Sequence, residues 1–299
     1  MTSPSPIQPL TLPEITAAAI DVGVLRLDTL HPVVSGNKWF KLKAHLHEAL
    51  QQSASSILTF GGAWSNHIIA TAFAAQQAGI PAIGIIRGER PPNLSATLES
   101  AAAYGMQLEF ISRKDYMQKD SQAFLGEYSA RFPGVYIIPE GGAGKVGIQG
   151  SEYILRSNNT SRYSHILCAV GTGTMFLGLA TAATNTQEII GIPVLKGIND
   201  LSAIARDGCP TPGRQTQCRI LPHWHFGGYA RLSQELLDFM NRFYRDTGIP
   251  SDFVYTGKLF YALMDMVRQK LFPPGSRLLV IHSGGLQGNR SLTPGILDF

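Results

Sequence analysis

Charged residues are scarce in this sequence, and neither sign dominates. Only 15% of the 299 residues are charged, against about 25% in a typical soluble domain, and 25 basic and 21 acidic side chains leave a net charge of +4. No five like charges follow one another, which excludes a polybasic arm and an acidic tail. An excess this small and scattered gives no footprint for nucleic acid, so we expect no nucleic-acid partner.

Cysteine is scarce as well. The chain has Cys168, Cys209 and Cys218, an odd number without C-x-x-C spacing, which excludes a disulfide framework and a zinc knuckle. His223 and His225 form an H-x-H pair, but no carboxylate is placed to complete a metal site, and we expect no metal. Reduced thiols are typical of cytoplasmic proteins, and the cytoplasm is the predicted location.

The sequence also lacks a recognisable signal peptide and a long apolar run. Met1–Pro9 has no Lys or Arg and no apolar core, so we do not interpret it as a signal peptide. Ala49–Ile86 contains no charged residue, but Gly61-Gly62 and Gly79-Ile80-Pro81 interrupt it. A membrane-spanning helix needs about 20 mostly apolar residues in a row. The stretch therefore favours a buried strand and helix, and we expect no membrane partner.

Short apolar runs alternate with helical patterns along the chain, and glycine is frequent, with 31 residues. The expected strands are 57–60, 82–86, 108–111, 135–138, 165–170, 188–195 and 277–281; the expected helices are 66–78, 94–104, 115–131, 146–156, 174–183, 232–245 and 258–270. Asp207–Gln217, rich in Gly, Pro and Thr, predicts a surface loop. The alternation predicts an α/β protein with mostly parallel sheets, and its length suggests about two domains.

The first candidate site follows the expected strand 165–170. Ligands of parallel sheets bind beyond the carboxyl ends of the strands, and there the chain reads Gly171-Thr172-Gly173-Thr174. Glycines allow close backbone approach, and a helix N-terminus attracts an anion, so the turn suits a phosphate. It is not G-x-G-x-x-G, because the next glycine is Gly178, and no P-loop motif occurs. The alternative is an ordinary tight turn.

A second candidate, Gly61-Gly62-Ala63-Trp64-Ser65-Asn66-His67, also joins a strand to a helix. Its N–H groups and side chains could bind a carboxylate, and Ser65 could act as an acid, base or nucleophile. Nothing at a fixed spacing supports a hydrolase triad. The alternative is that Ser65 or Asn66 caps the helix.

A third candidate is Lys38 within Ser35-Gly36-Asn37-Lys38-Trp39-Phe40-Lys41-Leu42-Lys43. A lysine in a desolvated pocket loses basicity and can form a Schiff base. The alternative is a surface lysine at the start of an amphipathic helix, and Lys43 fits that description.

Together with Val254-Tyr255-Thr256-Gly257-Lys258 and His282-Ser283-Gly284-Gly285, these motifs are more specific than any one alone. From about Gly36 to Gly288 the chain resembles the pyridoxal-phosphate enzymes of fold type II, the tryptophan synthase β-like fold. Within them it is similar to the 1-aminocyclopropane-1-carboxylate (ACC) deaminase and D-cysteine desulfhydrase family.

The resemblance implies a two-domain architecture, with a larger discontinuous domain of residues 1–45 plus 146–299 and a smaller domain of residues 46–145. It also implies a homodimer, a small amino-acid substrate and the cofactor pyridoxal 5′-phosphate. Lys38 would hold this cofactor as a Schiff base and move the α-proton of the substrate.

The resemblance implies further site residues. The cofactor phosphate would be bound by Lys41, Gly171, Thr172, Gly173 and Thr174. The ring hydroxyl would be bound by Asn66, and the ring nitrogen would lie beside Thr256 and Ser283. The substrate carboxylate would be bound by Ser65 with the backbone of Asn66 and His67. Tyr229 and Tyr255 match two active-site tyrosines, so the implied catalytic set is Lys38, Ser65, Tyr229 and Tyr255.

Thr256 helps to choose the reaction. ACC deaminases tend to have Glu at this position, where a carboxylate would keep the ring nitrogen protonated, whereas Thr is typical of D-cysteine desulfhydrases. A neutral partner favours β-elimination, in which the leaving group departs with the electrons, over opening of a cyclopropane ring. The sequence departs from the family at Met175, Phe253 and Trp64.

Two alternatives stay open, and the three departures raise the first of them. One is a pyridoxal-phosphate-binding protein without turnover. Another is a nicotinamide-dependent oxidoreductase that uses the segment from Gly171 to Gly178.

Overall fold

The computed structural model describes residues 4–199 and 217–299. They form two compact units: unit 1 is Met1–Asn37 with Ser151–Phe299, and unit 2 is Lys38–Gly150. The domain limits expected after residues 45 and 145 fall inside helices α2 (Asn37–Gln51) and α7 (Gly144–Arg156). The expected loop at 207–217, apart from Gln217, lies outside the described residues, as does Cys209.

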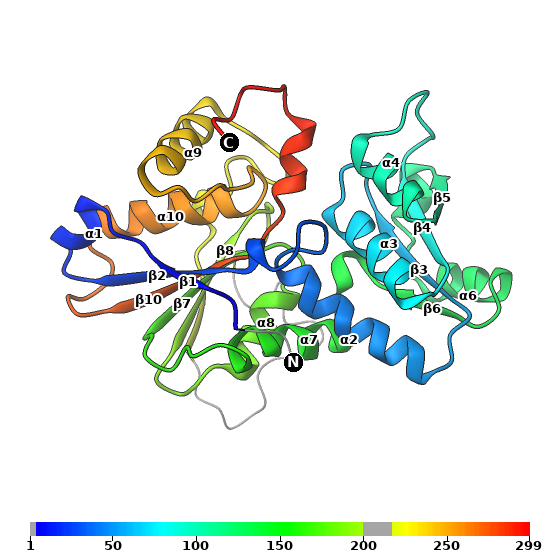
Figure 1. Ribbon diagram of the computed structural model, residues 1–299, viewed down its shortest axis with the longest axis horizontal. Coiled ribbons are helices and arrows are strands. Elements are labelled where there is room, and N and C mark those ends of the chain that lie inside the picture. The colour runs from blue at the N-terminus through cyan, green and yellow to red at the C-terminus, as the bar shows by residue number, and fades with distance from the viewer. Residues whose placement is uncertain (1–3, 200–216) are drawn as a thin grey trace. The chain divides into compact units, whose positions relative to one another are not determined.

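Unit 1 is built on a sheet with the strand order β1-β2-β10-β7-β8-β9 (Figure 1). Its strands are β1 (Ile7–Pro9), β2 (Asp21–Arg26), β7 (His165–Val170), β8 (Glu188–Pro193), β9 (Gln217–Ile220) and β10 (Arg277–His282). Among these described strands, only β1 runs antiparallel to its neighbour. The sequence pattern missed β1, β2 and β9 because these runs are short or contain Pro9, Gly23 or Arg219.

Helices cover both faces of the unit 1 sheet. Helices α1 (Pro13–Ala17), α9 (Gln234–Thr247) and α10 (Thr256–Arg268) share one apolar core with Val24 and Val280 of the sheet. Helix α8 (Thr174–Ala182) packs on the opposite face. There Gly191 leaves room for Phe176, since a Cβ at Gly191 would lie 2.9 Å from that ring. Helix packing on both faces fits the buried, apolar strands of a parallel sheet.

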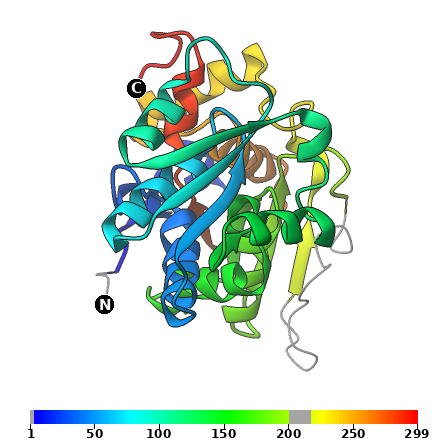
Figure 2. The same cartoon turned by 90° about the vertical axis from the view of Figure 1, so that its right-hand side faces the viewer.

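Unit 2 has a four-stranded parallel sheet in the order β5-β4-β3-β6, and these strands lie side by side in Figure 1 and Figure 2. They are β3 (Ser56–Gly61), β4 (Ala82–Arg87), β5 (Met106–Ile111) and β6 (Val135–Ile138). Helices α3 (Asn66–Ala78) and α4 (Ala96–Ala103) pack together against this sheet. Aromatic side chains of the segment 116–132 join a core with Leu58 and Phe60.

The single helix expected over 115–131 is wrong. The structure has α5 (Arg113–Tyr116) and α6 (Gln122–Arg131) instead. The hydroxyl of Ser121 accepts a hydrogen bond from the Phe124 amide at 3.3 Å, so it caps a new helix. The described 3₁₀ turns are η1 (Leu27–Thr29), η2 (Glu140–Gly142), η5 (Pro222–Trp224) and η6 (Leu286–Ser291). Within the described residues, no helix is both long and apolar enough to span a membrane.

Two backbone segments cross at the end of β10. The Asn37 amide donates to the Ser283 carbonyl at 3.2 Å, and the Gly36 amide donates to the Leu27 carbonyl at 2.8 Å. Gly36 has φ +67°, and a Cβ there would lie 1.8 Å from the Ser283 carbonyl oxygen. Only glycine satisfies both the left-handed backbone and this close approach.

Replacement of Gly36 by alanine should therefore destabilise the protein by about 3 kcal/mol or more, measured by urea unfolding. Gly79→Ala is the matched control, because Gly79 has φ +68° but no atom within 4 Å of the added Cβ. It should cost only about 1–2 kcal/mol for the left-handed backbone. Equal losses in the two variants would contradict the steric role of Gly36.

Candidate active site

In unit 1, candidate residues gather at the carboxyl edge of the parallel sheet. Strands β7 and β10 are neighbours, and Gly171 and Ser283 directly follow them. Tyr255 lies against this edge, since a Cβ at Gly171 would be 3.2 Å from its Cε1 atom. The ring of Tyr229 meets Tyr255 edge-on, with 6.2 Å between the centroids. The structure thus brings together a glycine turn and two phenols that are far apart in sequence.

The glycine turn leads into a helix without a side-chain cap. Gly173 is the N-cap of α8, with φ +82°, and the first turn contains no acidic residue. Helices α3, α4, α6 and α9 have a serine cap instead. The Thr172 and Thr174 hydroxyls lie 3.0 Å apart at the turn. Uncapped N–H groups and the helix dipole fit a phosphate.

Thr256 belongs to a cap built by Asp252. The Asp252 carboxylate accepts from the Val254, Tyr255 and Thr256 amides at 3.0, 2.9 and 2.9 Å, and from the Thr256 hydroxyl at 2.8 Å. The Thr256 hydroxyl in turn accepts from the Asp252 amide at 2.8 Å. Its only proton is thus given to Asp252, and these donors occupy the lone pairs of the carboxylate. Both residues are fully buried; sequence analysis singled out Thr256 but not Asp252.

His282 orients the turn that contains Ser283. Its Nε2 lies 2.7 Å from the Pro250 carbonyl, which can only accept, so Nε2 carries the hydrogen. Nδ1 accepts from the Gly284 amide at 3.3 Å. Burial lowers the pKa of His282, with Asp28 opposing the shift. Nδ1 also lies 3.4 Å from Oδ1 of Asp28, so the buried imidazole links this turn to Pro250 and to Asp28.

In unit 2, Lys38 and Lys41 are three residues apart in α2 and therefore lie on the same face of the helix. Lys38 is half-buried in the first turn, and Lys41 is 3% exposed. The Lys41 Nζ donates to the Gly141 carbonyl at 3.3 Å. Burial, then the charge of Lys38, lowers the pKa of Lys41 well below its usual range. No carboxylate of the described residues forms an ion pair with Lys41, so the position fits an external anion.

Two buried histidines lie near these lysines. The Thr59 hydroxyl donates to the Ile138 carbonyl at 2.8 Å, so it accepts from His67 Nε2, also at 2.8 Å. Burial is the largest cause that lowers the pKa of His67 and of His45, the latter to about 4. Both rings are therefore neutral at pH 7 and add no positive charge beside the lysines.

Ser65 adopts the alternative role that the sequence left open. Its hydroxyl oxygen accepts from the His67 amide at 3.2 Å and the Ile68 amide at 3.4 Å, and so caps α3. The His67 amide, expected to bind a substrate carboxylate, is thus engaged by the cap. The Ser65 hydroxyl can still donate its proton. Trp64 beside it is 41% exposed.

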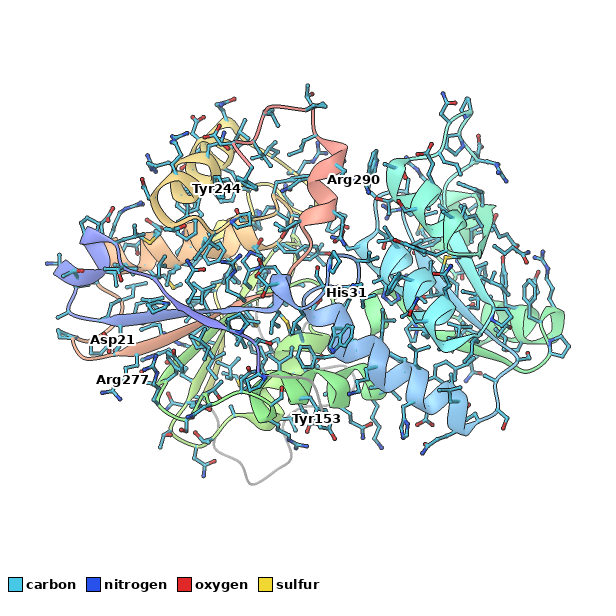
Figure 3. All side chains as sticks on the ribbon, viewed as in Figure 1. Asp21, His31, Tyr153, Tyr244, Arg277 and Arg290 are labelled. Carbon is cyan, nitrogen blue, oxygen red and sulfur yellow. The ribbon has the colours of Figure 1, made fainter. Side chains whose placement is uncertain are left out.

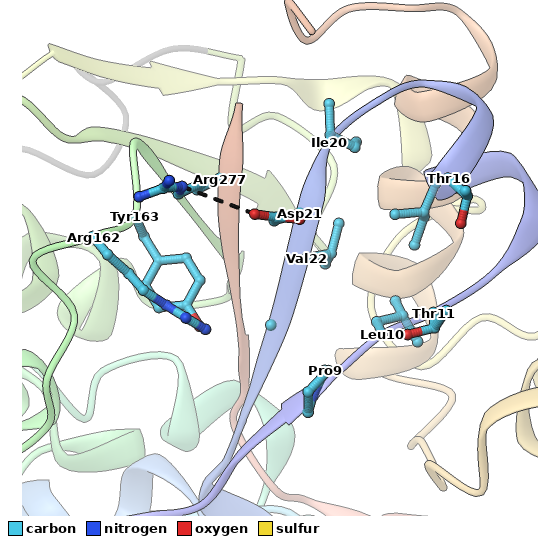
Figure 4. Close-up of a pocket in the computed structure, with 12 residues that line it drawn as sticks. Pro9, Leu10, Thr11, Thr16, Ile20, Asp21, Val22, Arg162, Tyr163 and Arg277 are labelled. Carbon is cyan, nitrogen blue, oxygen red and sulfur yellow. Dashed lines mark hydrogen bonds and ion pairs between the residues drawn. The ribbon is translucent and has the colours of Figure 1, made fainter. Parts of the chain in front are cut away.

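A pocket of about 290 Å³ in unit 1 contains none of these residues. Arg162, Tyr163 and Arg277 line it together with the start of β2 (Figure 4). Asp21 and Arg277 lie side by side there (Figure 3), with 3.9 Å between Oδ2 and Nε. Asp21 and Arg277 are the first residues of β2 and β10, so this pocket lies at the opposite end of these strands from the candidate residues.

Comparison with known proteins gives the class. Residues 4–284 match the family described as pyridoxal-phosphate dependent enzymes. The chain belongs to this family, and its cofactor is pyridoxal phosphate. The fold is the type II fold, as the resemblance implied.

Named relatives narrow the class. A Pyrococcus horikoshii protein provisionally named ACC deaminase is 29% identical over 95% of this chain and 90% of its own length. The mitochondrial bifunctional D-cysteine desulfhydrase/ACC deaminase of Arabidopsis thaliana is 26% identical over 95% of this chain and 77% of its own. The solved structure of an ACC deaminase homologue superposes with a TM-score of 0.79 at 25% identity, covering 95% of this chain and 90% of that one.

The cofactor class fits the residues described above. Pyridoxal phosphate carries a phosphate, and this chain offers an uncapped helix N-terminus after Gly171 and a buried Lys41 that has no acidic partner among the described residues. It also has Lys38 beside Lys41 on α2, a position suited to a Schiff base.

Lys41→Met should raise the stability of the cofactor-free protein by about 1–3 kcal/mol, because an apolar side chain replaces a buried amine. The same change should remove the rise in melting temperature that inorganic phosphate gives to the wild type. Since the folded pKa of Lys41 is lowered, wild-type stability should also increase toward pH 10.5 relative to the variant. Lys43→Met, at an exposed site of the same helix, is the control and should change neither property. An unchanged phosphate response in Lys41→Met would contradict this assignment.

Proposed function

We propose that this chain is a pyridoxal-phosphate-dependent lyase of the D-cysteine desulfhydrase type, which acts on a small amino acid. The reaction is β-elimination and hydrolysis, in which D-cysteine and water give a 2-oxo acid, ammonia and sulfide. The alternative is ACC deaminase, in which ACC and water give 2-oxobutanoate and ammonia. The observation that carries the choice is the neutral hydroxyl of Thr256 after Tyr255, with the nearby Asp252 carboxylate engaged by its own cap.

The chemistry of the two reactions differs in where the electrons go. Pyridoxal phosphate withdraws electrons from the substrate Cα when it is bound. In β-elimination the electrons at Cα form a double bond to Cβ, and hydrosulfide departs with the electron pair of the C–S bond, so little negative charge accumulates. Ring opening of ACC has no such leaving group and needs a stronger electron sink. A neutral side chain at Thr256 therefore favours elimination.

Each site residue has a role in this proposal. Lys38 removes the α-proton, and Tyr229 and Tyr255 supply phenol hydroxyls that can protonate the departing group. The Ser65 hydroxyl proton and Asn66 bind the substrate carboxylate, whereas the His67 amide serves the cap of α3. The cofactor is bound by Lys41, Asn66, Gly171, Thr172, Gly173, Thr174, Thr256 and Ser283. The proposed location is the cytoplasm, and the proposed assembly is a homodimer. Light scattering of the purified protein tests the dimer.

Lys38→Ala should abolish the visible absorbance of lysine-bound cofactor and essentially all turnover, because no other group replaces its amine. Spectra and an assay for ammonia and 2-oxo acid measure both effects. Lys43→Ala is the matched control and should keep both. If borohydride reduction and peptide mapping place the pyridoxyl group on Lys41 or Lys43, the role of Lys38 is wrong.

Small D-amino acids with a β leaving group should be better substrates than ACC. The measurement is kcat/KM of the wild type for D-cysteine, β-chloro-D-alanine and ACC. Thr256→Glu should shift the ratio toward ACC by about tenfold, or about 1.4 kcal/mol of differential barrier, since its carboxylate strengthens the electron sink. If ACC is the fastest of the three substrates with the wild type, the ACC deaminase assignment replaces the present one.

A further inference from the structure

The segment His225–Ala230, here named the tyrosine turn, carries Tyr229 in a strained backbone. Phe226 and Ala230 have φ +49° and +52°, in the left-handed region that side chains disfavour. Gly227 and Gly228 between them have φ +85° and +114°. Strain of this kind persists only where the surroundings impose it, and it is frequent at functional sites. The contacts that impose it are therefore of interest.

The strongest of these contacts comes from Lys258, whose side chain is fully buried. Its Nζ donates to the His225 carbonyl at 3.0 Å and to the Gly228 carbonyl at 2.7 Å. The Gly228 amide closes the turn by donating to the His225 carbonyl at 2.9 Å. One amine thus fixes both ends of the strained segment that precedes Tyr229.

Helix α10 holds the tyrosine turn at a second point and also supplies the partner of Tyr229. Tyr261 lies one turn after Lys258, and its ring meets Phe226 edge-on at 4.8 Å. Tyr255 is the N-cap of the same helix, and its ring lies 6.2 Å from that of Tyr229. The position of Tyr229 relative to Tyr255 is therefore set by one rigid element.

A buried amine is a costly way to fill this space. Burial lowers the pKa of Lys258 to about 8, with Asp252 opposing the shift, and no carboxylate of the described residues forms an ion pair with Lys258. An apolar side chain of similar length would avoid the desolvation cost. It could not bind two carbonyls, however, and this is what the lysine adds.

We propose that Lys258 is a positioning residue, which holds the tyrosine turn so that Tyr229 stays beside Tyr255 during the reaction. The inference rests on the proposed function only for the role of Tyr229. The amine bonds to backbone alone, so its effect on the reaction passes through the turn.

Hydrogen exchange of the holoenzyme tests the structural half of this proposal. Lys258→Met should speed exchange of the amides of residues 226–230 by at least tenfold, with little change in the sheet. Lys196→Met is the matched control: its stem approaches the same turn, 3.4 Å from a Cβ built at Gly228, but its side chain is exposed. Unchanged exchange in Lys258→Met would overturn the proposal.

A double-mutant cycle tests the functional half. Lys258→Met should lower kcat for D-cysteine at least tenfold with KM changed less than threefold, as Tyr229→Phe should. In the Tyr229→Phe background the second substitution should add less than a threefold loss, because both act through one phenol. Additive losses would show that Lys258 acts elsewhere and would overturn the proposal. If no amino acid is turned over, the proposed function fails, and hydrogen exchange still decides the role of Lys258. If Lys258→Met does not fold, Lys258→Leu, which also lacks a donor group, takes its place with the same criteria.

Discussion

Parallel strand pairing is the constraint on which both units depend. Parallel neighbouring strands end at the same edge of the sheet. Backbone pairing alone therefore brings together turns that are distant in sequence. In unit 1 this edge carries the turns after β7 and β10, and in unit 2 the turns after β3 and β6. Helices on both faces leave these turns as the places where backbone N–H groups remain without a ladder partner. The candidate site residues therefore lie mostly in turns, and neighbouring helices fix the positions of these turns.

Three buried polar side chains near these turns differ in the partners that they bind. The Asp252 carboxylate accepts hydrogen bonds from amides at the start of its own helix, so it bonds only to neighbouring residues. Lys258 bonds to carbonyls some 30 residues away in sequence and links two elements. Lys41 has one carbonyl partner and no acid among the described residues, so part of its bonding capacity is left for a ligand. The partners of each buried side chain thus indicate its role: Asp252 caps a helix, Lys258 links two elements, and Lys41 is suited to bind a ligand.

Sequence patterns predict the regular elements well where an apolar run is bounded by turn residues. The expected limits of β6, β7 and α3 agree with the structure, since glycine, proline or serine marks their ends. The pattern fails at β2, where Gly23 breaks the apolar run so that Tyr163 can lie across the strand. It also fails at Ser121, because a serine inside an amphipathic stretch does not reveal by itself that it caps a new helix.

The candidate site shows the same division. Glycine turns and Lys38 are visible as local motifs, and family resemblance supplies their roles. Lys258 and His282 lie in motifs that the sequence displays, yet their hydrogen bonds go to carbonyls 30 or more residues away, which no local pattern encodes. The burial of Lys41 follows from Gly142, whose lack of a side chain leaves space against its stem, 3.3 Å from a built Cβ.

The glycine cap of α8 links the stability of the fold to ligand binding in the proposed site. A missing side-chain cap costs a helix about 1 kcal/mol, and in the proposed site the cofactor phosphate would compensate for this loss. Ligand binding stabilises a fold in proportion to the logarithm of ligand concentration over its dissociation constant. In the proposed site, the stability of the fold would therefore depend on the concentration of pyridoxal phosphate.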